Sequence, residues 1–382
     1  MFISLLLLCH FYTAYVIQLW NNLKKHYPNI RISLLTSESA RIQYLQELTL
    51  ENGEEIFTVS NLPRRHFLAY YVAIRQLPHF DIIQPLWLDI RWGVFAGSFK
   101  NKAEHIYISV GGSDVYRQSK NGLTKYYQKR LIKRASVISS ETSQTRELFY
   151  ETYGEWTRAI PHHIVRFGVD VIDSIKRYNT DAVSQLKAKW NIPPDKTVVM
   201  LGYNGSKEHQ HLAMICAIEK LLPEALDKCF FIIPMTYGVP NEAYRLQVEE
   251  SISRITDRYM ILDTFLRTDQ MAEITIVTDI MLHMQTTDQL SSTMMAHLFQ
   301  GNVVLAGSWL PYSDLKEKGI LLFDVDDFHS LVPALNDVVQ NVGIYKKKCE
   351  INRIKVYEFS SWEYCIKGWY SIYEALTKRH QR

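Results

Sequence analysis

A chain of 382 residues is long enough to bury two apolar cores, and 47% hydrophobic with 22% charged residues is an ordinary globular balance. The five cysteines are scattered and form no CxxC pair, which argues against a disulfide framework or a zinc site. The net charge of +3 is unevenly divided, because residues 1–166 carry +7 and the remainder carries −4.

The first segment, "MFISLLLLCHFYTAYVIQLW", begins with an apolar run that could be mistaken for an export signal. It has no positively charged start and no small-residue cleavage site, and it is too short to span a bilayer. We therefore expect Phe2 to Leu8 to form a buried first strand. No later run of about 20 apolar residues predicts a transmembrane helix.

Short apolar runs and helical stretches then alternate along the whole chain. "NIRISLLT", "EIFTV", "HIYISV" and "SVISS" are separated by segments such as "RRHFLAYYVAIRQL", and the rhythm restarts at "TVVMLGYNG". This alternation predicts an α/β protein with parallel strands. We expect two doubly wound, Rossmann-like domains that face a central cleft.

The expected division has four parts. Residues 1–166 form a first domain, 167–195 an interdomain connection containing Pro193-Pro194, and 196–358 a second domain. Residues 359–382 form an aromatic helix that packs back across the domain junction.

One basic stretch in the first half, "KYYQKRLIKR", interleaves cations with aromatic and aliphatic residues. Such a segment fits peripheral contact with an anionic membrane surface, and a solvated helix face is the alternative. No nucleic-acid partner is expected. The five cations are Lys125, Lys129, Arg130, Lys133 and Arg134.

In open α/β sheets, ligands bind outside the carboxyl ends of the strands. The polar run Gln285 to Thr293 follows a strand and ends at a helix start, where free N–H groups favour an anion such as phosphate. Capping of that helix is the alternative. Applied to each strand end of the second half, this rule yields the ligand-binding candidates Tyr203, Asn204, Gly205, Lys207, Thr236, Tyr237, Phe265, Leu266, Gln285, Thr287, Asp288, Gln289, Ser291, Ser292 and Thr293.

The roles of these candidates follow from their chemistry. Glycines allow close backbone approach to a ligand, and Lys207 can neutralise a diphosphate. In the first half, Gly111, Gly112, Ser113 and Asp114 end a strand at the edge of the expected cleft. The Asp114 carboxylate is the candidate catalytic base, and capping of a turn is its alternative.

Several familiar sites are not expected. The chain has neither GxxxxGK[ST] nor a GxGxxG after a strand, so a P-loop enzyme or a Rossmann dehydrogenase is disfavoured. His209 and His211 are two residues apart on one predicted helix. Their side chains should therefore not share a face, and a zinc site is not expected there. Asp324, Asp326 and Asp327 precede a helix and are expected to cap it. We predict no metal and no cofactor.

Four segments together resemble the GT-B fold of nucleotide-sugar glycosyltransferases, especially the family-4-like group. They are "VGGSDVYR", "IVRFGVDVIDSIK", "LGYNGSKEHQHL" and "DIMLHMQTTDQLSSTMMAHLFQGNVVLAG". A weaker resemblance, in "IPMTYGVPNEAY", is to the bacterial transferase that moves 4-acetamido-4,6-dideoxygalactose onto a lipid-linked glycan. Asp288 falls at the first glutamate of the donor motif, Ala296 replaces the second, and Gly111 stands where many members have histidine.

The resemblance implies a metal-independent cytoplasmic glycosyltransferase of hexosyltransferase type, peripheral at the inner face of the plasma membrane. It would move a sugar from a nucleoside-diphosphate sugar to a glycan acceptor, lipid-linked, in bacterial surface polysaccharide synthesis. The 196–358 domain, with the ligand-binding candidates above, would then bind the donor. The 1–166 domain, with Gly111, Gly112 and Ser113, would bind the acceptor. Two alternatives stay open: a non-catalytic GT-B subunit, motivated by Ala296 and Gly111, and a GT-B-like epimerase.

Overall fold

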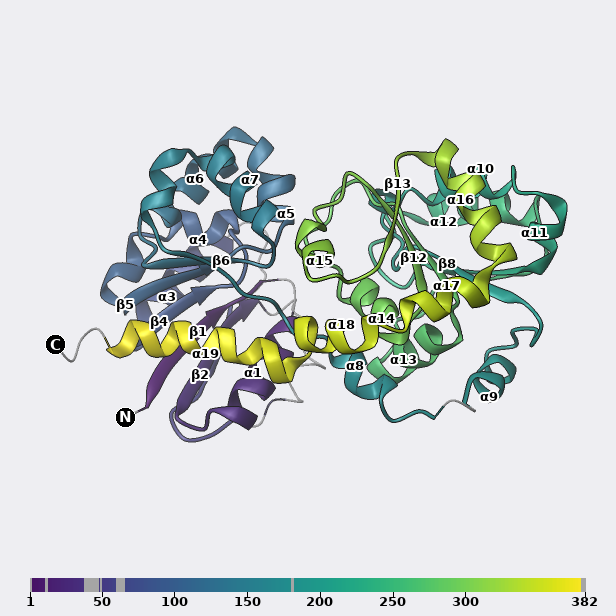
Figure 1. Ribbon diagram of the computed structural model, residues 1–382. Helices are drawn as coiled ribbons and strands as arrows, with labels where there is room; N and C mark the ends of the chain where they lie inside the picture. The colour runs from purple at the N-terminus through teal and green to yellow at the C-terminus, as the bar shows by residue number, and fades with distance from the viewer. Residues whose placement is uncertain are drawn as a thin grey trace. The chain divides into compact units, whose positions relative to one another are not determined.

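The computed structural model describes residues 2–10, 13–37, 48, 50–59, 66–179 and 182–378. The chain forms two compact units (Figure 1). The first unit comprises Met1–Gly168 and Trp362–Arg382, and the second comprises Val169–Ser361. Within the described ranges, no helix is both long enough and apolar enough to cross a membrane.

The first unit is built on a seven-stranded sheet in the order β3-β2-β1-β4-β5-β6-β7, with all neighbours parallel. Strand β1 lies in its interior, and Leu5 to Leu8 are fully buried, which confirms the expected first strand. Its strands are β1 (Ile3–Leu8), β2 (Ile30–Ser37), β3 (Ile56–Val59), β4 (Phe80–Pro85), β5 (Ala103–Ser109), β6 (Val137–Ser140) and β7 (His162–Ile164).

Helices cover both faces of this sheet (Figure 1). One apolar core joins the sheet to α3, α4, α6 and α7, and the other joins it to α1 and α19. The helical segments are α1 (Thr13–His26), α3 (His66–Gln76), α4 (Ile90–Val94), η1 (Ser98–Asn101), α5 (Ser113–Tyr116), η2 (Gln118–Lys120), α6 (Gly122–Ile132), α7 (Ser143–Tyr153), η3 (Glu155–Ala159) and α19 (Trp362–Lys378).

The last helix, α19, returns to the first unit. The Tyr373 hydroxyl donates to Gln84 Oε1 at 2.6 Å, and the Trp369 indole N–H donates to the Arg166 carbonyl at 2.8 Å. The Tyr370 ring stacks on Tyr27 with centroids 3.7 Å apart. The aromatic residues that marked this helix in the sequence are therefore its packing face, and the chain passes between the units twice.

The second unit repeats the plan with a six-stranded parallel sheet in the order β10-β9-β8-β11-β12-β13. Two apolar cores, one on each face, confirm a doubly wound arrangement. Its strands are β8 (Thr197–Leu201), β9 (Cys229–Pro234), β10 (Tyr259–Leu262), β11 (Ile280–His283), β12 (Val303–Gly307) and β13 (Phe323–Val325).

Residues 169–195 belong to the second unit, where the buried Lys187 ammonium donates to the carbonyls of Pro194 and Lys196 at 3.2 and 2.8 Å. The helical segments of this unit are α8 (Asp170–Ile175), α9 (Ala182–Lys189), η4 (Lys207–His209), α10 (His211–Ile218), α11 (Pro223–Lys228), α12 (Glu242–Ser253), α13 (Thr268–Val277), α14 (Ser292–Gln300), α15 (Ser313–Glu317), α16 (Phe328–Gln340), α17 (Val342–Cys349) and α18 (Asn352–Ser360).

Candidate functional site

The candidate donor site is the carboxyl edge of the second sheet. All six strands are parallel, so the loops that follow them emerge at this one edge. The sheet order places β8 beside β11, the point at which the strand order reverses. The loops after these two strands, 202–210 and 284–291, therefore meet at the switch point of the fold.

The loop after β8 is held by tight contacts with its neighbours. A Cβ on Gly205 would lie 2.2 Å from Val239 Cγ2, and the Gly205 N–H donates to the Tyr237 carbonyl at 2.7 Å. Gly202 has φ +64°, a conformation that favours glycine. The nearly buried Asn204 accepts from the Ser206 N–H at 2.8 Å. These glycines are required by the packing of adjacent loops before any ligand is considered.

Lys207 is exposed at the start of η4, where the sequence analysis placed a cation. Its ammonium lies 5.4 Å from the centre of the Tyr244 ring, which comes from α12. The Tyr244 hydroxyl is 3.1 Å from His211 Nδ1. Tyr244 was not among the sequence candidates, and its ring forms a cation–π contact with the lysine.

Some residues of the polar run after β11 hold the local structure, and others stay accessible. Ser291 is the N-cap of α14, and its hydroxyl accepts from the Met294 N–H at 3.2 Å, which confirms the predicted cap. The Thr286 N–H donates to the Glu208 carbonyl at 2.9 Å, and their side chains are also hydrogen-bonded. Gln210 donates to the Met284 carbonyl at 2.6 Å, so the loops after β8 and β11 are fixed together.

A hydrogen-bonded cluster lies at the base of the same run. The Tyr312 hydroxyl donates to Asp288 Oδ2 at 2.5 Å and is 2.6 Å from His283 Nε2. The Trp309 indole N–H donates to the Gln285 carbonyl at 2.9 Å. The Asp288 carboxylate is thus aimed by a tyrosine and a histidine, and its side chain stays 11% exposed.

His283, Trp309 and Tyr312 were missed by sequence reasoning. His283 ends β11, and the other two follow β12 in "AGSWLPY". The strand-end rule that located the other loops applies equally to β12, and that signal would have found Trp309 and Tyr312.

The ends of β9 and β10 bring two exposed rings together. Tyr237 and Phe265 are 6.3 Å apart between ring centroids, with an interplanar angle of 52°. Thr236 beside them is half-buried. Leu266 is instead buried in the apolar core of the unit, so its side chain faces away from this pair.

The remaining candidates cluster at the start of α14. Thr287, Ser292 and Thr293 are half-buried, and Gln289 is nearly buried. Ala296 is buried in the core one turn further along the helix. The position that carries the second glutamate in the resembled motif is therefore an apolar packing position in this chain.

Buried histidines line the inner side of these loops. Burial lowers the pKa of His209 well below its ordinary value and lowers that of His211 to about 4. The two rings lie 5.7 Å apart, because the left-handed Gln210 separates η4 from α10. The expectation that His209 and His211 occupy one helix and point apart is wrong. Even so, no group of three His, Cys, Asp or Glu side chains in the described part of the chain could hold a metal.

Asp114, in the first unit, is fully buried. Its carboxylate accepts from the backbone N–H groups of Leu88 at 2.8 Å and Gly111 at 3.1 Å, and from Val115 at 3.1 Å. Burial raises the pKa of this carboxyl, and the N–H donors partly oppose the rise. The Asp114 side chain thereby fastens the loops after β4 and β5.

Glycine is required at the two positions beside Asp114, 111 and 112, for two different steric reasons. A Cβ on Gly111 would lie 1.6 Å from the Trp87 ring, so no side chain fits there. Gly112 has φ +87°, and Ser113 begins α5. The departure from histidine at position 111 is explained by the indole of Trp87, which fills that space.

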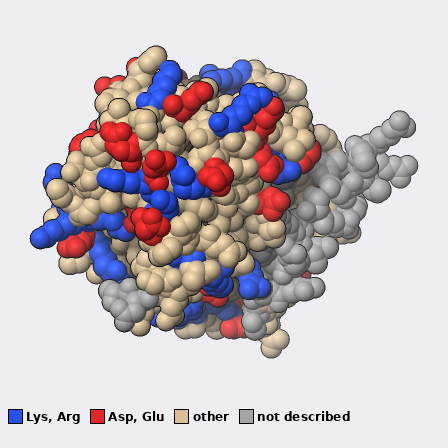
Figure 2. Space-filling view, turned by 90° about the vertical axis from the view of Figure 1, so that its right-hand side faces the viewer, with Lys and Arg blue, Asp and Glu red and all other residues tan. Residues whose placement is uncertain are grey.

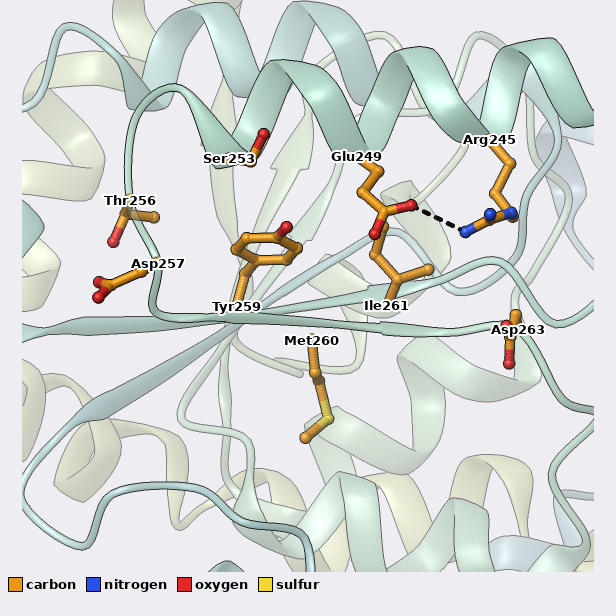
Figure 3. A pocket seen from close by; sticks show the side chains of 9 residues that line it. All are labelled: Arg245, Glu249, Ser253, Thr256, Asp257, Tyr259, Met260, Ile261 and Asp263. Atoms are coloured by element: carbon orange, nitrogen blue, oxygen red, sulfur yellow. Dashed lines mark hydrogen bonds and ion pairs between the residues drawn. The ribbon is translucent and has the colours of Figure 1, made fainter.

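A groove of about 490 Å³ also runs along the edge strand β10 (Figure 3). Tyr259 and Ile261 point toward α12 across it, and Met260 points to the opposite side of the strand. Its one cation, Arg245, is paired with Glu249 at 3.0 Å. Acidic residues dominate its remaining charge, so it is unsuited to a diphosphate.

Comparison with solved structures defines the fold class: this chain has the GT-B fold. Anabaena HepE, solved with UDP and glucose, matches at 13% identity and a TM-score of 0.78, over 98% of this chain and 100% of its own. Sucrose-phosphate synthase from Thermosynechococcus elongatus matches at 13% identity and 0.76, over 99% and 100%. A UDP-forming trehalose-phosphate synthase from Burkholderia xenovorans matches at 12% and 0.71, over 99% and 100%. The sequence matches no protein-family model and no curated protein sequence.

Proposed function

We propose that this chain is a glycosyltransferase that moves a sugar from a nucleoside-diphosphate sugar to a glycan acceptor. The observation that carries the proposal is the group of polar loops around β8 and β11, at the switch point of a GT-B second unit. In such a site the protein supplies fixed donors and charges for a departing diphosphate.

The proposed donor site divides into three parts. Lys207 and the N–H groups at the start of α14 receive the diphosphate, because a cation and a helix N-terminus both favour phosphate oxygens. The exposed Tyr237 and Phe265 rings receive the flat base. The Asp288 carboxylate, oriented by Tyr312, accepts hydrogen bonds from sugar hydroxyls.

Asp114 is assigned a positioning role in this proposal. Its carboxylate is fully buried and already accepts three backbone N–H donors. A general base must reach the proton that it removes. A base for an inverting reaction would therefore have to come from another residue or from the substrate.

The acceptor is proposed to be lipid-linked, and the pathway to be bacterial surface polysaccharide synthesis at the cytoplasmic face of the membrane. The resemblance of "IPMTYGVPNEAY" to a lipid-glycan transferase supports this, as does the basic stretch of α6. The similar Anabaena HepE was solved with UDP and glucose and with UDP-glucose, so UDP sugars are the first donors to test.

The test is release of nucleoside diphosphate from candidate sugar nucleotides, with and without a lipid-linked acceptor. Transfer predicts release that depends on acceptor. An isomerised sugar nucleotide formed without acceptor would replace the proposal with an epimerase. Nucleotide binding without turnover, for every acceptor, would favour a non-catalytic subunit.

A further inference from the structure

The first unit carries an apolar surface on two of its helices. Six large apolar side chains on α3 and α6 are between 41% (Tyr71) and 63% (Leu123) exposed. We call this surface the docking face. Its apolar members are Phe67, Leu68, Tyr71, Val72, Leu123 and Tyr126.

Both helices present this surface on the same side of the unit. Helices α3, α4 and α6 share one apolar core on one face of the sheet, so their outer sides all turn away from it (Figure 1). Phe67 of α3 contacts Phe95 at the end of α4, with ring centroids 6.2 Å apart. Gly93 lets α4 approach the backbone of α6 at Tyr127 closely. Through Phe95 and Gly93, α4 thus links α3 to α6 on this side of the unit.

Cations dominate the charge of this region, and Asp89, the carboxylate that caps α4, pairs with Arg91 at 2.5 Å. Residues 66–80, 90–103 and 115–140 hold one, three and seven Lys or Arg, and no Asp or Glu. Among the described residues, the cations of α6 and its C-terminal turn form no ion pair with a carboxylate; Lys125, Lys129, Arg130, Lys133 and Arg134 are these residues. By contrast, the face of the molecule in Figure 2 intersperses both signs.

We propose that the docking face binds an anionic lipid bilayer, with the apolar side chains of α3 and α6 inserted at the headgroup boundary and the surrounding cations against lipid phosphates. Exposed apolar side chains beside Lys and Arg are the features that hold an interfacial helix on such a surface. A single-stranded nucleic acid would stack bases on the aromatic members but leave the aliphatic Leu68, Val72 and Leu123 in water.

The role of this docking rests on the proposed function, because it would bring the enzyme to a lipid-linked acceptor. Binding itself needs neither donor nor catalysis. Vesicle binding and nucleotide binding can therefore fail independently of each other.

The test is co-sedimentation of the whole chain with phosphatidylcholine vesicles, with or without phosphatidylglycerol. The wild type is expected to bind only the anionic vesicles. The triple variant Arg130→Gln, Lys133→Gln, Arg134→Gln should lose about fivefold in affinity for each cation removed. The apolar variant Leu68→Ser, Val72→Ser, Leu123→Ser should lose at least about tenfold, since three exposed aliphatic side chains no longer insert.

A matched control lies in the second unit. Ile344 and Ile354 are also exposed beside lysines of α17 and α18, and Ile344→Ser with Ile354→Ser should leave binding unchanged. The proposal is overturned if the wild type ignores anionic vesicles, if the apolar variant binds like the wild type, or if only the control variant loses binding. Nucleotide-induced thermal shifts, measured on the same proteins, report the donor site separately and show that each variant is folded.

Discussion

At the scale of single residues, Lys207 is the most direct probe of the donor site. Its side chain is exposed, and its ammonium has no ion pair or hydrogen bond with another described side chain, so its loss should not disturb folding. Lys207→Ala is expected to weaken nucleoside-diphosphate affinity about tenfold, the worth of one charge-assisted hydrogen bond. Isothermal titration calorimetry measures this directly.

The control is Lys220→Ala, which removes an exposed lysine just beyond the other end of α10. This variant should keep wild-type affinity. Equal affinities for the wild type and Lys207→Ala would remove Lys207 from the site.

A variant of Asp114 can distinguish a structural role of this carboxylate from a catalytic role. Asp114→Asn keeps the size but replaces one accepting oxygen by an NH₂ group, which leaves a backbone N–H unpaired. We expect unfolding in urea to be easier by about 1–3 kcal/mol, with donor affinity retained. Normal stability together with a loss of turnover of about a hundredfold or more would instead identify a general base.

At the scale of elements, the path of the loop after β8 requires a residue without a side chain, Gly205. Gly205→Ala would place a Cβ 2.2 Å from Val239 Cγ2 and 3.3 Å from the Tyr237 carbonyl, so Val239 and the loop that carries it must shift. We expect a lower melting temperature and weaker nucleotide binding, because Tyr237 and Lys207 lie on the displaced segments. The cost should be about 1–3 kcal/mol, as for other overpacked sites.

Gly343→Ala in α17 is the matched control, since a Cβ there meets nothing within 4 Å. It should stabilise the protein by about 0.5–1 kcal/mol through higher helix propensity. A neutral Gly205→Ala variant would mean that the loop after β8 is less constrained than its contacts indicate.

Elements were also the level at which the sequence was most informative. Strands buried on both faces appear as apolar runs, so β1, β8 and β11 could be located from their composition. The Ser291 and Asp327 caps were readable because capping needs only a short polar side chain at the right offset.

The cluster of His283, Asp288 and Tyr312 was not predictable in the same way. Its members come from two strand ends, and their contact depends on β11 lying beside β12 with a particular loop path. Sequence order alone does not specify which way a loop side chain turns. Asp114 shows the same limit, since its residue type fits both a base and a turn, and only burial decides between them.

At the scale of the whole molecule, buried histidines make stability depend on pH. In the second unit, burial lowers the pKa of His211 to about 4 and that of His297 to about 3, whereas an unfolded histidine titrates near 6.5. The unfolded chain therefore binds more protons below pH 6.5. The free energy of unfolding should have its full value above that pH. It should fall on acidification toward pH 4, by up to about 1.4 kcal/mol per pH unit for each histidine.

Urea unfolding at a series of pH values tests this dependence. His297→Gln should flatten the slope between pH 6.5 and 4 by up to about one proton, as linkage requires. The exposed His329→Gln should leave the slope unchanged. Stability that is constant over this range would contradict the neutral state of these histidines.

The central claim is that the second unit of this GT-B protein binds a nucleoside-diphosphate sugar. The most direct measurement is a thermal-shift screen of the whole chain against UDP, GDP, TDP, CMP and their common sugars. A ligand that binds only the folded state raises the melting temperature, and saturation at about 100 times Kd is worth about 2.7 kcal/mol. The account predicts a selective rise with one nucleotide diphosphate, reduced in Lys207→Ala. No shift with any of them, from well-folded protein, would contradict it.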